Sequence, residues 1–412
     1  MQILYITHYS IMEPLGQSQI LPYLTGLARR GHAIEILSFE KQALLADLNR
    51  FRLQNESLQD CGIGWYPRTY RGGSSAGKLL ADVFRTAREL NRRCARRRID
   101  LIHCRAHVPF LMAWFPSALR RIPVLFDFRG FIAEEYVDAG LWKADGIQFR
   151  LIKRLERKMA HSSSAMVVLT NPVRDYISDT YGIPAGKLFV IPCCVDLQRF
   201  LPDGTPTSRA PGRPLRVVYS GSTDGRYDLP AMLRFFSLLR ERRPGSHFTI
   251  LSTGDLARVQ GLVEKASVPC DSVTVKTLPH HQVPSLLSEQ DLGLFFLRGG
   301  LTLLAASPTK IGEYLASGLP VVAEKGIGGL EEILEDQGVG HLARSDQPET
   351  LQSILDAALQ LCDRGDTRLK AIQTAGRYYS LERGIEAYAK TYEYAVRSTA
   401  SEAAKTGTGQ NS

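Results

Sequence analysis

The sequence predicts an α/β protein made of two Rossmann-like domains, each with a parallel sheet covered by helices. The chain has 412 residues, which is more than one ordinary hydrophobic core accommodates. Short apolar segments typical of buried strands alternate with helical segments in both halves. Residues 203–214 (DGTPTSRAPGRP) are rich in Pro, Gly, Ser and Thr, which is typical of a linker between domains.

The first half opens with a strand, a helix and a second strand, predicted at residues 3–7, 18–30 and 33–39. Parallel strands joined by a right-handed crossover are expected from this order. Further strands are predicted at residues 101–103, 123–128, 166–169 and 189–191. Because ligands bind at the carboxyl ends of strands in such sheets, the loop with Gly16 and Gln17 lies at a candidate binding edge.

Asp127 lies near the end of one predicted strand, and Arg129 follows that strand. A charge that is buried without a partner is costly, so these side chains should face a cleft or each other. In a cleft, both are candidate catalytic residues. If the two side chains face each other, they form an internal ion pair. The residues alone leave both alternatives open.

The second half repeats the design of the first. A strand at residues 216–220 leads through a polar loop into a helix at residues 229–240. Gly221 in this loop permits close approach of a ligand to the backbone, and Ser222 and Arg226 can bind phosphate. The alternative is a plain strand–helix turn. Later strands are predicted at 247–252, 273–277 and 292–296, and helices near 348–362 and 381–398.

Residues 307–322 (SPTKIGEYLASGLPVV) predict a loop, a helix over residues 310–317 and a strand over residues 321–323. Ser307 and Thr309 supply hydroxyls suited to capping the helix, and Gly318 is suited to ending it. The N-terminus of a helix presents free N–H groups and a partial positive charge, and these favour anions.

Lys310 adds a full charge at this helix start, and Glu313 lies one turn further along the same face. This combination suits a nucleotide diphosphate with a hydroxylated sugar beside it. The alternative is an ordinary helix start with a solvated Lys–Glu pair. His280 and His281 have no third ligand at metal spacing, so no metal site is predicted.

The net charge is +9, and residues 1–200 carry all of the excess, with 28 Lys and Arg against 18 Asp and Glu. Two predicted helices concentrate this charge, at residues 85–98 and 150–158. They are either solvated faces or a docking surface for an anionic membrane. Few aromatic residues interleave with these arginines, so nucleic acid is not an expected partner.

Seven cysteines without a C-x-x-C pair favour a reducing cytosol. The N-terminal residues have no basic leader or cleavage site, so no signal peptide is expected. The longest apolar stretch, residues 108–119, is too short to span a bilayer. These observations together predict a cytoplasmic protein, peripheral on the inner face of the cell membrane.

Four motifs, in this order, resemble those of the retaining glycosyltransferases of family 4, which have the GT-B fold. They are EPLGQSQILPYL (13–24), FDFRGFIAEEYVDAGLW (126–142), IPCCVDLQRF (191–200) and SPTKIGEYLASGLPVV (307–322). The resemblance implies two Rossmann-like domains that face each other across a cleft. Residues 1–200 would bind the acceptor, residues 213–380 would bind a nucleotide sugar, and residues 381–398 would cross back to the first domain. Residues 399–412 are small and polar, so their composition predicts a disordered tail.

The resemblance further implies transfer of a hexose from a UDP- or GDP-sugar to a glycan or lipid-linked acceptor, with retention and without a cofactor or metal. Glu313 would hold the ribose hydroxyls, and Lys310 and Arg226 would neutralise the diphosphate. Gly16 would let the first loop approach the donor phosphate. Asp127 occupies the position of a polar group on the acceptor side.

Two positions depart from the family pattern. Ala305 stands where the first Glu of an E-x7-E motif is expected, and Ala231 stands where a Lys is expected after Arg226. A nucleotide-sugar epimerase of the same fold and a non-catalytic nucleotide-sugar-binding subunit are therefore the alternative functions.

Overall fold

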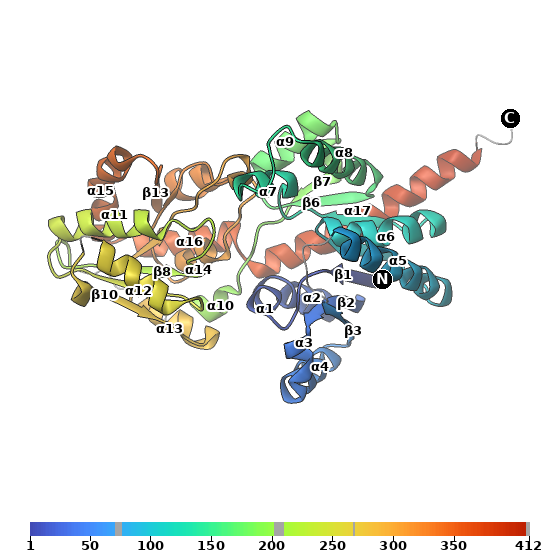
Figure 1. The fold of residues 1–412 in the computed structure, drawn as a ribbon, viewed down its shortest axis with the longest axis horizontal. Coiled ribbons are helices and arrows are strands. Elements are labelled where there is room, and N and C mark those ends of the chain that lie inside the picture. Colours follow the sequence, from blue (N-terminus) through green and yellow to red (C-terminus); the bar gives the residue numbers. More distant parts are fainter. Residues whose placement is uncertain (71–75, 202–209, 267, 409–412) are drawn as a thin grey trace. The chain divides into compact units, whose positions relative to one another are not determined.

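The computed structural model describes residues 1–70, 76–201, 210–266 and 268–408. Contacts divide the chain into two compact units, and each is a parallel sheet with helices packed against it (Figure 1). The first unit comprises residues 1–133, 142–191 and 381–412, and the second comprises residues 134–141 and 192–380. Residues 192–200 therefore belong by their contacts to the second unit, whereas the motif reading assigned them to the first domain. Residues 203–209 of the expected linker lie outside the described residues.

The first unit has a seven-stranded parallel sheet in the order β3-β2-β1-β4-β5-β6-β7. The strand order reverses between β1 and β4, so a crevice for ligands is expected at the carboxyl ends of these two strands. The strands are β1 (Gln2–Thr7), β2 (Ala33–Lys41), β3 (Ile63–Tyr70), β4 (Leu101–Arg105), β5 (Val124–Asp127), β6 (Ala165–Val168) and β7 (Leu188–Val190).

The helices of the first unit lie between these strands in the sequence. They are α1 (Pro14–Gln19), α2 (Leu21–Arg29), α3 (Gln42–Ala46), α4 (Leu48–Asp60), α5 (Ala76–Arg96), α6 (His107–Arg120), α8 (Ile147–Ser162) and α9 (Asn171–Tyr181). The single helix expected at residues 18–30 is in fact two helices, because the chain breaks at Ile20 and Pro22 stands in the first turn of α2. A further helix, α7 (Ile132–Asp138), begins in the first unit and ends in the second.

The edge strand β3 was not predicted from the sequence. Pro67 lies within it, and a proline cannot donate to the hydrogen-bond ladder. Pro67 is tolerated because β3 has only one neighbour, β2, with which it pairs in parallel.

The last helix, α17 (Leu381–Thr408), packs on the first unit through one apolar face. Ile385, Tyr388 and Tyr392 on this face are buried. Gly26 of α2 makes room for this helix, since a Cβ at Gly26 would lie 2.1 Å from Cδ1 of Ile385. The helix continues past residue 399, where a disordered tail was expected, as far as Thr408. Residues 409–412 lie outside the described residues.

The second unit has a six-stranded parallel sheet in the order β10-β9-β8-β11-β12-β13. Its strands are β8 (Arg216–Ser220), β9 (His247–Leu251), β10 (Val273–Lys276), β11 (Leu292–Phe295), β12 (Val321–Glu324) and β13 (Gly340–Ala343). Its helices are α10 (Leu197–Phe200), α11 (Leu229–Arg242), α12 (Leu256–Lys265), α13 (Val283–Ser288), α14 (Thr309–Ala316), α15 (Pro348–Asp363) and α16 (Thr367–Tyr378). Neither β13 nor α16 was predicted.

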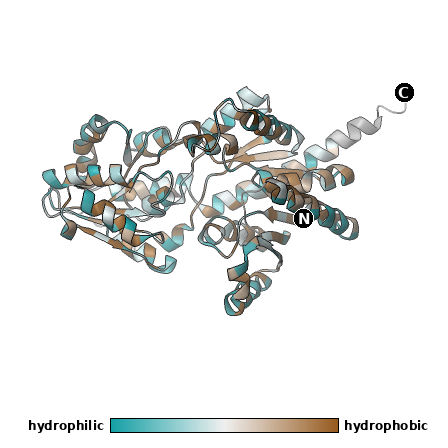
Figure 2. Cartoon of the chain, viewed as in Figure 1, coloured by the Kyte–Doolittle hydropathy of each residue, from teal (hydrophilic) through white to brown (hydrophobic). Residues whose placement is uncertain are grey.

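Both sheets are apolar at their centres, and their strands are largely brown in Figure 2. Strands buried on both faces are continuous apolar runs rather than alternating patterns, as in parallel sheets covered by helices. All seven cysteines are free thiols. No helix of the described residues combines the length and the apolar character needed to cross a bilayer.

Candidate functional site

The helix predicted at residues 310–317 is α14, shifted by one residue to Thr309–Ala316. Its N-cap is Pro308, and no side chain caps it, so the expected capping hydroxyl is absent. Oγ of Ser307 instead accepts a hydrogen bond from the backbone N–H of Cys193, at 3.1 Å. Gly318 adopts φ +77° directly after the helix, as expected for a residue that ends it.

The ammonium group of Lys310 lies among three aromatic rings. Its Nζ is 4.5 Å from the ring centroid of Tyr227, 4.8 Å from that of Phe295 and 5.1 Å from that of Tyr219. Within the described residues, this nitrogen has no hydrogen-bond acceptor or ion-pair partner. Burial lowers the pKa of Lys310 to about 8, while Glu313 partly opposes this effect. The rings therefore hold a cation whose hydrogen-bond donors remain unused.

Gly221 packs against the ammonium group that the three aromatic rings surround. It has φ +145°, and a Cβ at this position would lie 2.4 Å from Nζ of Lys310. Only a glycine therefore lets the loop after β8 touch the ammonium group. The N–H of Gly221 donates to the carbonyl oxygen of Leu251.

The other predicted residues of this loop bind mainly to the loop itself and to the chain after β11. Oγ of Ser222 accepts from the N–H of Asp224, and Ser222 O accepts from the Tyr219 hydroxyl. Arg226 donates through Nε to the carbonyl oxygen of Arg298, at 2.8 Å. The guanidinium of Arg226 thus joins the two loops that flank Lys310.

The Glu313 carboxylate lies on the same face of α14 as Lys310, and its side chain is 13% exposed. Nε2 of His280 lies 3.9 Å from Oε1 of Glu313. Nδ1 of His280 lies 3.0 Å from Nη2 of Arg199. Because the guanidinium can only donate, Nδ1 accepts, and the neutral ring carries its proton on Nε2 toward Glu313.

Ala305, which replaces an expected glutamate, is buried at 5% exposure. A carboxylate nevertheless reaches the same loop from a distant part of the chain. Asp138, at the end of α7, accepts hydrogen bonds from the Thr302 hydroxyl and from the N–H of Gly300. Sequence reasoning missed Asp138, His280 and the rings around Lys310, since no local spacing relates them to α14.

Asp127 is fully buried in the first unit. One of its oxygens, Oδ2, lies 3.4–3.5 Å from side-chain nitrogens of three residues: His103, Arg105 and Arg129. Tyr388 of α17 also donates to this oxygen, at 3.4 Å. Burial would raise the pKa of Asp127, but Arg129, His103 and Arg105 outweigh it and lower the pKa to about 2. The structure thus contains the internal ion pair that was the alternative to a catalytic role for Asp127 and Arg129.

Gly16 and Gln17 lie in α1, after β1. A Cβ at Gly16 would lie 2.4 Å from the carbonyl oxygen of Ser10, so this glycine serves close packing within its own loop. Nε2 of Gln17 donates to Ile11 O at 2.8 Å and to Oε1 of Gln54 at 2.6 Å. The described residues contain no cluster of three His, Cys, Asp or Glu side chains that could hold a metal ion.

Comparison with known proteins matches both halves of the chain to glycosyltransferases. The family model Glycosyltransferase Family 4 matches residues 20–199, and the model Glycosyl transferases group 1 matches residues 214–363. A D-inositol 3-phosphate glycosyltransferase from Nocardia farcinica is 25% identical over 279 residues, which are 64% of this chain. The match spans only 60% of that relative.

Solved structures of similar fold extend over nearly the whole chain. A glycosyltransferase from Rickettsia africae has a TM-score of 0.69 and 15% identity, covering 96% of this chain and 98% of its own. HepE from Anabaena, in complex with UDP, has a TM-score of 0.68 and 16% identity, covering 95% and 100%. The chain therefore has the GT-B fold and is similar in both halves to glycosyltransferases.

Proposed function

We propose that this protein is a retaining glycosyltransferase that transfers a hexose from a UDP- or GDP-sugar to a glycan or lipid-linked acceptor. The observation that carries the proposal is the ammonium of Lys310, held by three rings against Gly221 at the start of α14. A cation with unused donors beside a helix N-terminus fits the diphosphate of a nucleotide sugar. Retention rests on the resemblance to family 4.

The chemistry proposed for this site is electrostatic. As the bond from the sugar to the diphosphate breaks, negative charge grows on the leaving oxygen, and Lys310 with the N–H groups of α14 stabilises it. The Glu313 carboxylate accepts hydrogen bonds from the ribose hydroxyls. Lys310 supplies positive charge at the leaving diphosphate without a metal ion, so we expect turnover to persist in the presence of a chelator.

The direct test combines binding and transfer. UDP-, GDP- and ADP-sugars are screened for thermal stabilisation, where a donor at 100 times its Kd adds about 2.7 kcal/mol. Sugar transfer from the stabilising donor is then assayed with and without EDTA. Stabilisation by none of these donors would refute the proposal. Formation of an isomeric donor in the absence of acceptor would instead identify an epimerase.

Glu313→Gln is expected to weaken donor binding by about 1–3 kcal/mol, the value of a hydrogen bond to a charged group. Calorimetry compares the donor sugar with its free base and with phosphate, which both lack the ribose. A loss of affinity seen only for the donor sugar locates the effect at the ribose. Glu241→Gln, an exposed carboxylate on α11, is the matched control and should bind as the unmodified protein does. Equal affinities of Glu313→Gln and the unmodified protein would remove Glu313 from the site.

A surface of the first unit supports a peripheral position on an anionic membrane. Helix α5 contacts α6, and α6 contacts α8. Each of these three helices exposes two apolar side chains that are four residues apart. The pairs are Leu80 and Phe84, Phe115 and Leu119, and Ile147 and Leu151. Exposed basic residues accompany them: Arg85, Arg88, Arg92, Arg120, Arg150 and Arg154. Apolar side chains beside basic ones are typical of helices that lie in a membrane interface.

Replacing Arg85, Arg88 and Arg92 with Gln should weaken binding to anionic vesicles by about 3 kcal/mol, at about 1 kcal/mol per basic residue. Flotation with phosphatidylglycerol vesicles at low salt measures this change. The control replaces three exposed arginines of the second unit, Arg216, Arg242 and Arg344, with Gln. If both triple variants float equally, the membrane is not bound through α5.

A further inference from the structure

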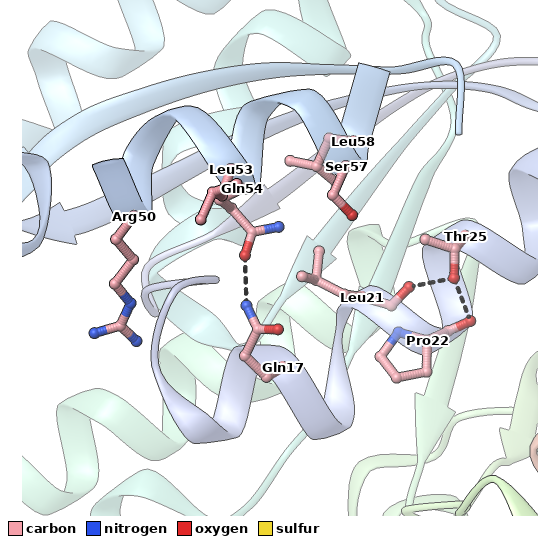
Figure 3. Close-up of a pocket in the computed structure, with 9 residues that line it drawn as sticks. All are labelled: Gln17, Leu21, Pro22, Thr25, Arg50, Leu53, Gln54, Ser57 and Leu58. Atoms are coloured by element: carbon pink, nitrogen blue, oxygen red, sulfur yellow. Dashed lines mark hydrogen bonds between the residues drawn. The ribbon is translucent and has the colours of Figure 1, made fainter. Parts of the chain in front are cut away.

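Hydrogen bonds between side chains that are distant in the sequence hold a loop in each unit. In the first unit, Nε2 of Gln17 on α1 donates to Oε1 of Gln54 on α4, and Figure 3 shows this bond beside the groove between α1, α2 and α4. These two residues are 37 positions apart. In the second unit, residues 298–306 lie between β11 and α14, and the Thr302 hydroxyl of this loop donates to Oδ2 of Asp138, 164 positions earlier. The loop that leads into α14 is therefore held by a remote segment of the chain.

Asp138 is the last residue of α7 and belongs by its contacts to the second unit. Its Oδ2 also accepts from the N–H of Gly300, at 3.4 Å, and a Cβ at Gly300 would lie 3.7 Å from Oδ1. The carboxylate thus packs against the backbone of the loop as well as against the buried Thr302. Because hydrogen bonds to an ionised acceptor are stronger than those between neutral groups, Asp138 restricts the conformation of this loop.

The conformation of the loop in turn fixes Arg226. A Cβ at Gly299 would lie 2.8 Å from Oγ1 of Thr302 and 2.3 Å from Nη2 of Arg226, so the hydroxyl and the guanidinium pack against the same backbone position. Nε of Arg226 donates to the carbonyl oxygen of Arg298, and the N–H of Arg298 donates to the carbonyl oxygen of Arg226, both at 2.8 Å. A shift of residues 298–302 would therefore displace the guanidinium.

The Arg226 guanidinium keeps one donor in reserve. Its Nη2 is buried and has no hydrogen-bond acceptor within the described residues. Buried polar atoms are nearly always hydrogen-bonded, so a buried nitrogen without an acceptor indicates a ligand that supplies one. The ring of the adjacent Tyr227 contacts the ammonium of Lys310, so two cations with unused donors lie on neighbouring residues of one site. The oxygens of a phosphate would accept from both cations.

We propose that Asp138 is a positioning residue for the transfer reaction. Through Thr302 and Gly299 it holds Arg226 where the free Nη2 donates to the negative charge that develops on the leaving diphosphate. This inference rests on the proposed transferase function. The carboxylate acts through the loop and not by contact with the donor, since a second negative charge beside the diphosphate would oppose the departure of the leaving group. Its role is therefore that of a hydrogen-bond acceptor.

Steady-state kinetics of the full chain tests this role. Release of UDP, GDP or ADP from the sugar nucleotide that stabilises the protein, with water as the acceptor, gives kcat and KM. Asp138→Ala should lower kcat by about 10-fold to 100-fold with little change in KM, since a displacement of about 1 Å can cost 10²-fold in rate. Thr302→Val, which removes the hydroxyl and keeps the shape of the side chain, should give the same loss.

Two further variants of acidic residues serve as controls. Asp138→Asn should recover most of the kcat, because its amide oxygen accepts the same hydrogen bonds without the charge. Asp145→Ala removes an exposed acid between α7 and α8 and should react as the unmodified protein does. Retained kcat in Asp138→Ala, a loss confined to KM, or Asp138→Asn as slow as Asp138→Ala would each overturn the inference.

A double-mutant cycle separates positioning of Arg226 from a purely structural role of Asp138. Once Arg226→Gln has removed the guanidinium, Asp138→Ala should lower kcat no further, whereas a loss of stability in thermal unfolding should appear in both backgrounds. Additive losses in kcat would overturn the inference. If no sugar nucleotide stabilises the unmodified protein, the proposed function and this inference both fail. Donor stabilisation with a kcat that does not depend on Asp138 refutes this inference alone.

Discussion

Lys310→Met is expected to lower kcat by about 10²–10³-fold, the effect of removing one preorganised group that stabilises developing negative charge. Methionine keeps the length and apolar contacts of the side chain among Tyr219, Tyr227 and Phe295, so the fold should survive. The loss should fall on kcat more than on KM, because the leaving diphosphate gains charge in the transition state. Steady-state kinetics with the donor that stabilises the protein measures both constants.

The pH dependence provides an independent check on Lys310. With a pKa of about 8, this side chain loses its proton as the pH rises above 8, so donor affinity should fall between pH 7 and 9.5. The stability of the unliganded protein should change in the opposite direction. Because the folded pKa lies below the usual 10.5, the charged form disfavours folding, and stability rises as pH increases from about 8 to 10.5.

Lys310→Met should show neither dependence, whereas Lys370→Met, which removes an exposed lysine paired with Asp366, should retain both. Donor affinity of the unmodified protein that stays constant from pH 7 to 9.5 would exclude Lys310 as the diphosphate ligand. Retained kcat in Lys310→Met would exclude it as the stabiliser of the leaving group.

Asp127→Asn should destabilise the protein by about 3–5 kcal/mol, the cost of leaving a buried charge without its partner. The variant removes the countercharge of Arg105 and Arg129 in an interior where Asp127 itself is fully buried. Urea unfolding, followed by fluorescence and circular dichroism, measures the change. Asp175→Asn, an exposed carboxylate paired with Arg174, is the control and should be nearly neutral.

Acid unfolding should depend on the same carboxyl. Its folded pKa of about 2 lies below the usual 3.8, so its contribution to stability is complete above about pH 4 and declines as pH falls toward 2. Asp127→Asn should lose this part of the acid transition. A variant that keeps full stability but loses transfer activity would instead assign Asp127 a catalytic role.

Local patterns were sufficient to predict most of the framework. Continuous apolar runs predicted central strands of both sheets, and Gly318 predicted the end of α14. The edge strand β3 was missed because Pro67 contradicts the usual composition of strands. β13 was missed because Gly340 and His341 interrupt the apolar run that marked the other strands; Gly340 is required there, since a Cβ would lie 2.3 Å from Val321 O.

The environments of the candidate site residues could not be predicted, because they are made by distant segments. The rings around Lys310 come from the end of β8, the loop after it and β11. Arg129 is a local partner of Asp127, but the other partners, His103, Arg105 and Tyr388, come from β4 and α17. The spacing of Lys310 and Glu313 along one helix identified a charged face. It did not indicate that aromatic groups would desolvate the lysine, which decides its pKa.

The packing of α17 on the first unit has a consequence for synthesis of the protein. Tyr388 and Tyr392 contact His103 and Asp127, yet the ribosome makes them after every strand of the second unit. Domains usually fold in the order in which they emerge. Here the unit that emerges first cannot close its interior until α17 has been synthesised, so the second unit can complete its own core before the first unit receives α17.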